Sequence, residues 1–152
     1  MRTLAVLGAQ HQDVLGRLAA VETQLGSGET GALAGFAAYL EHEVMQHFAL
    51  EEQALFPILA RHLSLAQGPL AVMNTEHRAF RELLDGLGVA VRAHDQDAQR
   101  THASELIELL RAHIMKEDHV LFPMATRILA ADEQHDVDVR AAALGASGIP
   151  AV

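Results

Sequence analysis

Apolar residues recur at alternating spacings of three and four along most of this chain, which predicts long amphipathic helices. Four such segments run, with approximate bounds, over Thr3–Leu25, Thr30–Leu63, Pro69–His94 and Ala98–Ala131. Short links rich in glycine, serine, proline or aspartate separate them. Because the links are short, we expect an all-α fold, an up-down-up-down antiparallel four-helix bundle.

The chain is expected to hold one domain and a tail. Residues 1–132 carry the four helical patterns and are predicted to form the bundle. Residues 133–152 have weak periodicity and several glycines. We expect this tail to contain a short helix around Val137–Leu144 or to be disordered.

Some positions that should face the core carry polar side chains instead of apolar ones. They are His11, His47, Glu51, His77, His113 and Glu117. The other inward positions of the fourth segment are apolar and include Leu106, Leu110, Val120 and Met124. Residues four apart share a helix face. Each His-x3-Glu pair can therefore face one centre.

The same design occurs twice along the chain. His47–Pro57 and His113–Pro123 both read His, three residues, Glu, an acid, two residues, Leu-Phe-Pro. The offset that relates them also carries His11 onto His77. This predicts two helical hairpins related by a pseudo-two-fold axis. Pro57 lacks the N–H that a helix interior needs, so a kink or local distortion is expected there.

The inward histidines and glutamates together favour a metal site. One inward histidine, or one His-x3-Glu pair, is as easily an ordinary hydrogen-bonded core group. Burying the whole set without partners would cost about 1–3 kcal/mol for each unsatisfied polar group and several for each charge. Two divalent cations would remove that cost. Imidazole and carboxylate without sulfur suit Fe, Mn or Zn, whereas Ca²⁺ fits poorly.

Composition narrows the class of protein. The net charge is −9 and there is no basic cluster, which argues against nucleic acid and anionic membrane surfaces as partners. Cysteine is absent, so thiolate metal sites are excluded. The N-terminus lacks a signal-peptide pattern and no apolar run has membrane-spanning length. We expect a cytoplasmic protein, monomeric or homodimeric.

These motifs resemble those of the hemerythrin-like, or HHE cation-binding, family. The resemblance is carried by His11, the Glu76-His77 pair, and the two His-x3-Glu motifs with their Leu-Phe-Pro extensions, and covers about residues 3–131. It implies a non-haem di-iron centre with an oxo or hydroxo bridge inside the bundle. By analogy the four histidines are terminal ligands, and Glu51 and Glu117 bridge.

Two features depart from the oxygen-carrying members of that family. They have a second histidine on the third helix where this chain has Met73, which by the repeat matches Leu7. They also use His-x4-Asp on the fourth helix, a spacing that Asp118 satisfies. At 100° per residue, Glu117 is about 40° and Asp118 about 140° from the direction of His113. Glu117 is therefore the preferred ligand and Asp118 the alternative.

Three hypotheses for function follow. The first is a di-iron protein that senses or handles O₂, nitric oxide, peroxide or iron itself. The second is an enzyme that reduces peroxide or repairs damaged iron centres, which would need a redox partner of unidentified kind. The third is a structural or interaction module built on Zn or on a single metal. The sequence leaves open whether the protein is an enzyme.

Overall fold

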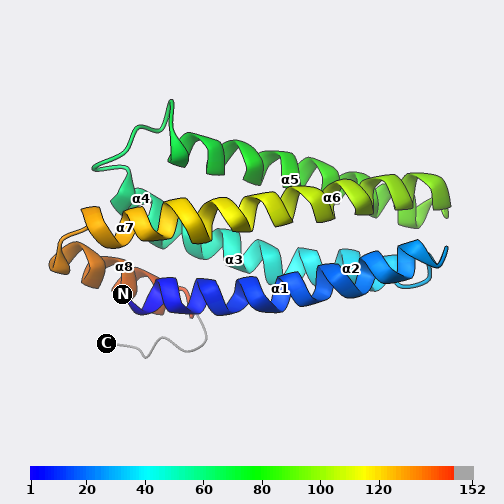
Figure 1. The fold of residues 1–152 in the computed structure, drawn as a ribbon, viewed down its shortest axis with the longest axis horizontal. Coiled ribbons are helices and arrows are strands. Elements are labelled where there is room, and N and C mark those ends of the chain that lie inside the picture. Colours follow the sequence, from blue (N-terminus) through cyan, green and yellow to red (C-terminus); the bar gives the residue numbers. More distant parts are fainter. Residues whose placement is uncertain (146–152) are drawn as a thin grey trace.

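The computed structural model describes residues 1–145. Four long helical runs lie side by side along the long axis of the molecule, and a shorter helix packs at one end (Figure 1). The all-helical prediction is confirmed, since residues 1–145 contain no strand. A description with four helices is incomplete, because the shorter helix is a fifth.

The four runs end within a few residues of the bounds predicted from periodicity. The first is α1 (Arg2–Gly26) and the third is α5 (Pro69–Arg92). The second is continuous through α2 (Leu33–Tyr39), η1 (Leu40–Val44), α3 (Met45–Leu50), η2 (Glu51–Leu55) and α4 (Phe56–Leu59), where η marks a π-helical turn. The fourth is continuous through α6 (Gln96–Lys116), η3 (Glu117–Leu121) and α7 (Phe122–Ile128). The fifth helix is α8 (Ala131–Ala143).

A π-helical turn leads into each Leu-Phe-Pro motif and ends at its leucine. Because Pro57 cannot donate a backbone hydrogen bond, the helix widens before it, and the Phe56 N–H bonds to the Glu51 carbonyl five residues back. The repeat reproduces this turn before Pro123, in η3. The predicted distortion is thus a π turn, and in both copies it begins at the glutamate of the His-x3-Glu motif.

The π turn in η3 shifts which side chains face the core beyond it. Periodicity placed Val120 and Met124 inward, but Val120 is 45% exposed. Leu121 and Ala125 are buried in their place. The extra residue in the turn advances the helix phase by about one position, which a regular 3.6-residue period does not anticipate.

The buried apolar side chains form two clusters, one on each side of a polar layer. On α1, Leu7 belongs to one cluster and Val14 to the other, with His11 between them. On α5, Met73 and Phe80 flank His77 in the same way. The core is therefore continuous along the bundle except where the predicted ligands interrupt it.

Helix α8 packs against the bundle. Val137 and Ala141 are fully buried in the same cluster as Leu7. The helix expected around residues 137–144 thus begins at Ala131, and residues 146–152 of the predicted tail lie outside the described residues. Within residues 1–145, no helix is long and apolar enough to cross a bilayer.

Asp138 on α8 caps the first turn of α1. Its carboxylate accepts hydrogen bonds from the Thr3 backbone N–H (2.8 Å), the Thr3 hydroxyl (2.7 Å) and the Arg2 N–H (3.1 Å). Burial raises the pKa of Asp138, but these hydrogen bonds outweigh burial and leave the pKa below its usual value. The ionised carboxylate thus ties the C-terminal helix to the N-terminal one.

We expect Asp138→Ala to destabilise the protein by about 1 kcal/mol, the usual loss for a helix cap. Because the carboxylate acts in its ionised form, the difference from wild type should be present at pH 7, begin to shrink below about pH 4, and be lost as the pH falls through the lowered pKa of Asp138 in the folded protein. Chemical denaturation over that pH range measures it. Asp136→Ala, which removes an exposed carboxylate from the same helix, is the control; an equal loss in both variants would contradict the capping role.

Candidate metal centre

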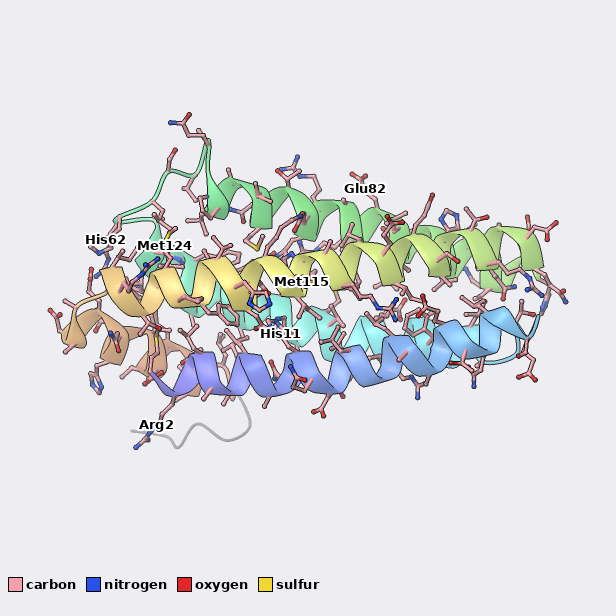
Figure 2. All side chains as sticks on the ribbon, viewed as in Figure 1. Arg2, His11, His62, Glu82, Met115 and Met124 are labelled. Atoms are coloured by element: carbon pink, nitrogen blue, oxygen red, sulfur yellow. The ribbon has the colours of Figure 1, made fainter. Side chains whose placement is uncertain are left out.

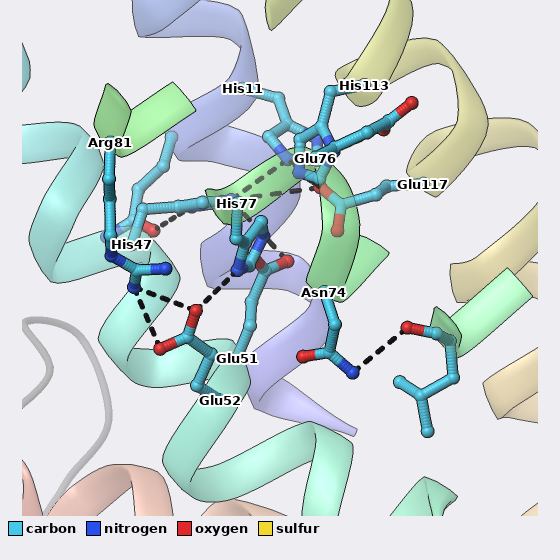
Figure 3. A network of polar contacts seen from close by, with 12 residues as sticks. His11, His47, Glu51, Glu52, Asn74, Glu76, His77, Arg81, His113 and Glu117 are labelled. Carbon is cyan, nitrogen blue, oxygen red and sulfur yellow. Dashed lines mark hydrogen bonds and ion pairs between the residues drawn. The ribbon is translucent and has the colours of Figure 1, made fainter. Parts of the chain in front are cut away.

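The structure brings all six predicted side chains to one place between the two core clusters. They come from each of the four long runs: His11 on α1, His47 on α3, Glu51 at the start of η2, His77 on α5, His113 on α6 and Glu117 at the start of η3. Each is at most 5% exposed. Figure 3 shows their polar atoms turned toward one another.

The six side chains form two overlapping groups, each compact enough for one ion. One group contains His11 and His47 and the other contains His77 and His113, and both contain Glu51 and Glu117. Within each group the potential ligand atoms lie within 4.8 Å of one another. The two glutamates are therefore common to both groups, as bridging carboxylates would be.

Each glutamate lies close to histidines of both groups. Glu117 Oε2 lies 3.1 Å from His11 Nε2 and 3.4 Å from His113 Nε2. Glu51 Oε1 lies 3.5 Å from His47 Nε2, and its Oε2 lies 3.3 Å from His77 Nε2. Glu117 Oε2 also lies 3.9 Å from His47 Nε2, so each carboxylate reaches histidines of both groups.

Buried polar atoms at this place lack hydrogen-bond partners. Both carboxylate oxygens of Glu51 and of Glu117, and the Nε2 atoms of His77 and His113, are unsatisfied among the described residues. Leaving such atoms bare in a protein interior costs free energy. A bound cation satisfies them together, so the residues present fit a metal centre.

The spacing of two ring nitrogens supports the same conclusion. His11 Nε2 and His47 Nε2 are 3.2 Å apart. If both Nδ1 atoms carry the proton, two lone pairs face each other at that distance and repel. Nitrogens bound about 2.1 Å from one ion at right angles would lie about 3 Å apart. A shared ion would place the two nitrogens at about the observed spacing and remove their repulsion.

An oxygen acceptor lies beside the outward Nδ1 of every inward histidine. The Nδ1–H groups donate across distances of 2.7 to 2.9 Å, from His11 to Asp118, His47 to Gln10, His77 to Glu52 and His113 to Glu76. Such a bond fixes the tautomer with the proton on Nδ1 and turns the Nε2 lone pair inward. All four imidazoles are thus held in the form that binds metals.

These four acceptors were not predicted as orienting groups. Each of them adjoins a predicted ligand in the sequence but pairs with a histidine on another helix, so sequence proximity gives no direct sign of the contact. Gln10 precedes His11, for example, yet accepts from His47. The repeat carried the signal, since its offset maps Gln10 onto Glu76 and Glu52 onto Asp118.

Burial and neighbouring charges set the protonation of the metal-free cluster. Burial lowers the pKa of His77 to about 4, and the nearby His113 adds to the effect, so His77 is neutral at pH 7. Burial raises the pKa of Glu51 well above its usual range, and the neighbouring Glu117 charge raises it further. Burial also opposes ionisation of Glu117, but the close approach of the His11 and His47 imidazoles outweighs burial and holds the pKa of Glu117 well below the usual range.

Asp118 and Glu117 occupy different environments. Glu117 is fully buried among the histidines, whereas the side chain of Asp118 is 29% exposed and accepts the Nδ1–H of His11. The geometry thus gives Glu117 the inward position and Asp118 a place outside the ligand set. Met73, where oxygen carriers have a further histidine, is buried in the apolar cluster with Leu7.

The remaining histidines do not join this cluster. His42, His62, His94, His119 and His135 are exposed, and His102 is half-buried. Figure 2 shows the contrast: His11 points into the space between the helices, whereas His62 lies at the periphery near one end of the molecule. The structure therefore separates the inward histidines from the others, as periodicity predicted.

Comparisons with known proteins agree with this geometry. The sequence profile of the hemerythrin HHE cation-binding domain matches residues 2–125. An iron–sulfur cluster repair protein YtfE from Enterobacter sp. (strain 638) is 36% identical over a 107-position alignment, which covers 61% of this chain and 46% of that protein. The YtfE protein of Yersinia pestis (strain Pestoides F) is 37% identical over a 106-position alignment, which covers 64% of this chain and 48% of that protein.

The chain therefore spans less than half the length of the curated relatives that it matches. No solved structure matches it significantly.

Replacing Glu117 should remove bound metal, whereas replacing Asp118 should only weaken metal binding. We expect Glu117→Ala to lose at least half of its bound metal, because both groups share this carboxylate. Asp118→Ala should still bind the full number of metal ions, with an affinity lowered about 10–100-fold. A loss of that size is usual when a hydrogen-bond partner of a metal ligand is removed. Elemental analysis and competition with a chelator measure these effects. If Asp118→Ala lost all of its metal and Glu117→Ala lost none, the aspartate would be the ligand.

Removing the metal should destabilise the fold. With free metal a thousandfold above its dissociation constant, binding contributes about 4 kcal/mol to the free energy of unfolding. For a chain of this size, the loss corresponds to a fall in Tm of roughly 10 °C. Calorimetry of metal-loaded and chelator-treated protein checks this, and equal melting temperatures would contradict a metal bound to the buried layer.

Proposed function

This chain belongs to the hemerythrin HHE cation-binding domain family, and from that premise we propose that it is a non-haem di-iron protein. His11 and His47 would hold one ion, and His77 and His113 the other. Glu51 and Glu117 would bridge them. The observation that carries the proposal is the pair of overlapping donor groups with two shared, unsatisfied carboxylates.

We also propose that the four long runs act as an up-down-up-down bundle of two related hairpins, to which α8 is added. Its support is the repeated π turn at η2 and η3, and the repeated placement of a histidine between the two clusters on α1 and α5. The proposal keeps the sequence-based expectation of a cytoplasmic protein, monomeric or homodimeric.

The bound ions would supply redox chemistry and open coordination positions for O₂, nitric oxide or peroxide, with an oxo or hydroxo group as a further bridge. The chain's own part is to prepare the site. The Nδ1 hydrogen bonds hold each imidazole with its Nε2 inward. The two apolar clusters exclude bulk water from both ends of the polar layer, which strengthens electrostatic interactions inside it.

Among the tasks open to such a centre, we favour the handling of damage to iron centres over reversible oxygen transport. The matching relatives are named iron–sulfur cluster repair proteins. The apolar Met73 leaves each ion two imidazoles and the two shared glutamates as donors, without the further imidazole of oxygen carriers. A metal-dependent repair activity would make the protein an enzyme or an accessory factor and would require a redox partner.

Repair can be tested on a hydratase whose [4Fe–4S] cluster has been damaged by nitric oxide. We expect the iron-loaded chain with a reductant to speed recovery of hydratase activity at least tenfold over reductant and free iron alone. His113→Ala should lose this effect because the ligand is gone, whereas His119→Ala, an exposed histidine on the same helical run, should keep it. Equal recovery with and without the chain would contradict the repair proposal.

A further inference from the structure

The two halves of the centre differ in how firmly they hold their histidines. The repeat makes His47 and His113 equivalent, yet their orienting acceptors are chemically different. His113 donates to the carboxylate of Glu76 (2.9 Å), and His47 donates to the neutral amide oxygen of Gln10 (2.9 Å). Hydrogen bonds to a charged acceptor are roughly twice as strong as neutral ones and make the imidazole a better ligand.

Basic side chains fix the acceptors in one half only. Arg81 donates to both oxygens of Glu52, at 2.8 and 2.9 Å, and Lys116 pairs with Glu76. The repeat places Leu15 where Arg81 would be and Leu50 where Lys116 would be. Within residues 1–145, no lysine or arginine pairs with Asp118. The basic partners withdraw some negative charge from their carboxylates, but they also hold them in position.

Aromatic packing follows the same division. The ring of His77 stacks on Phe48, with centroids 3.6 Å apart, and on Phe56 at 5.5 Å. The ring of His11 stacks on Phe122 at 5.3 Å. The repeat places Ile114 where a second phenyl ring would be. His77 is therefore packed against two phenyl rings, whereas His11, its counterpart in the repeat, stacks on one.

The half of the centre that contains His11 and His47 also borders the surface. His47 is 5% exposed, more than any of the other five inward residues. Its partner Gln10 lines a surface cleft of about 410 Å³, together with Gln46, Leu50 and Leu144. The hydrogen bond that positions His47 thus lies next to solvent, at a place where the last turn after α8 meets the bundle.

We propose that the two metal positions are inequivalent, and that the one held by His11 and His47 binds its ion more weakly and releases it first. Gln10 is the positioning residue responsible, because it offers His47 an uncharged acceptor beside a surface cleft. The inference rests on the proposed function in that it takes both donor groups to be occupied. It adds that the centre empties in two steps, through the side that faces the cleft.

Iron release to a chelator tests the order. The full chain, loaded with two ferrous ions under anaerobic conditions, is mixed with an excess of a water-soluble ferrous chelator. We expect one iron to leave at least tenfold faster than the other. Gln10→Glu keeps the side-chain length and supplies a carboxylate, so it should slow the fast phase about tenfold and leave the slow phase unchanged. Gln12→Glu, the same substitution at an exposed position of α1, should alter neither phase.

The converse variant tests the half of the centre that contains His77 and His113. Glu76→Gln should speed the slow phase, while Glu82→Gln, at an exposed position of α5 (Figure 2), should not. A Mössbauer spectrum taken after the fast phase should show that one iron environment remains. Circular dichroism identifies a variant that fails to fold, and Gln10→Glu then decides alone.

The results separate the two proposals. Two irons that leave in a single phase, or a fast phase that responds to Glu76→Gln and not to Gln10→Glu, would overturn the inequivalence and leave the di-iron proposal standing. A purified chain that takes up no iron would overturn the di-iron proposal itself.

Discussion

Two carboxylates and four imidazoles share one buried layer, and much of the structure is arranged around that constraint. Glu51 and Glu117 are fully buried with unsatisfied oxygens, in an interior whose other side chains are mostly apolar. Such a layer is costly without a cation and stabilising with one. The apolar clusters above and below it, and the π turns that begin at the two glutamates, are the local structure that brings the six proposed ligands from four helical runs to one place.

The hydrogen bonds outside the layer join the same elements a second time. Gln10 and Asp118 link α1 to the second and fourth runs, and Glu52 and Glu76 do the same for α5. Each helical run that carries one of the four histidines is thus also joined to a neighbouring run by a hydrogen bond from a histidine Nδ1–H. Rotation of one run about its axis would break both a ligand position and an outer hydrogen bond. Metal geometry and helix packing are coupled in this way.

Periodicity and the repeat predicted the helical class, the approximate helix bounds and the residues that converge. They could not predict details that depend on local backbone geometry or on contacts between helices. A π turn exchanged Val120 for Leu121 in the core, because one extra residue per turn breaks the 3.6-residue phase. The capping of α1 by Asp138 depends on a contact between α1 and α8, which are far apart in the sequence. The role of Gln10 is visible only across α1 and α3, since its partner lies on another helix.

The most direct test of the account is the metal content and low-temperature Mössbauer spectrum of protein produced with ⁵⁷Fe and purified without added chelator. A centre built from two donor groups that share both glutamates predicts close to two irons per chain and a spectrum of a spin-coupled pair. One metal ion per chain, or zinc in place of iron after growth in iron-sufficient medium, would contradict the di-iron assignment and favour a single-metal structural module.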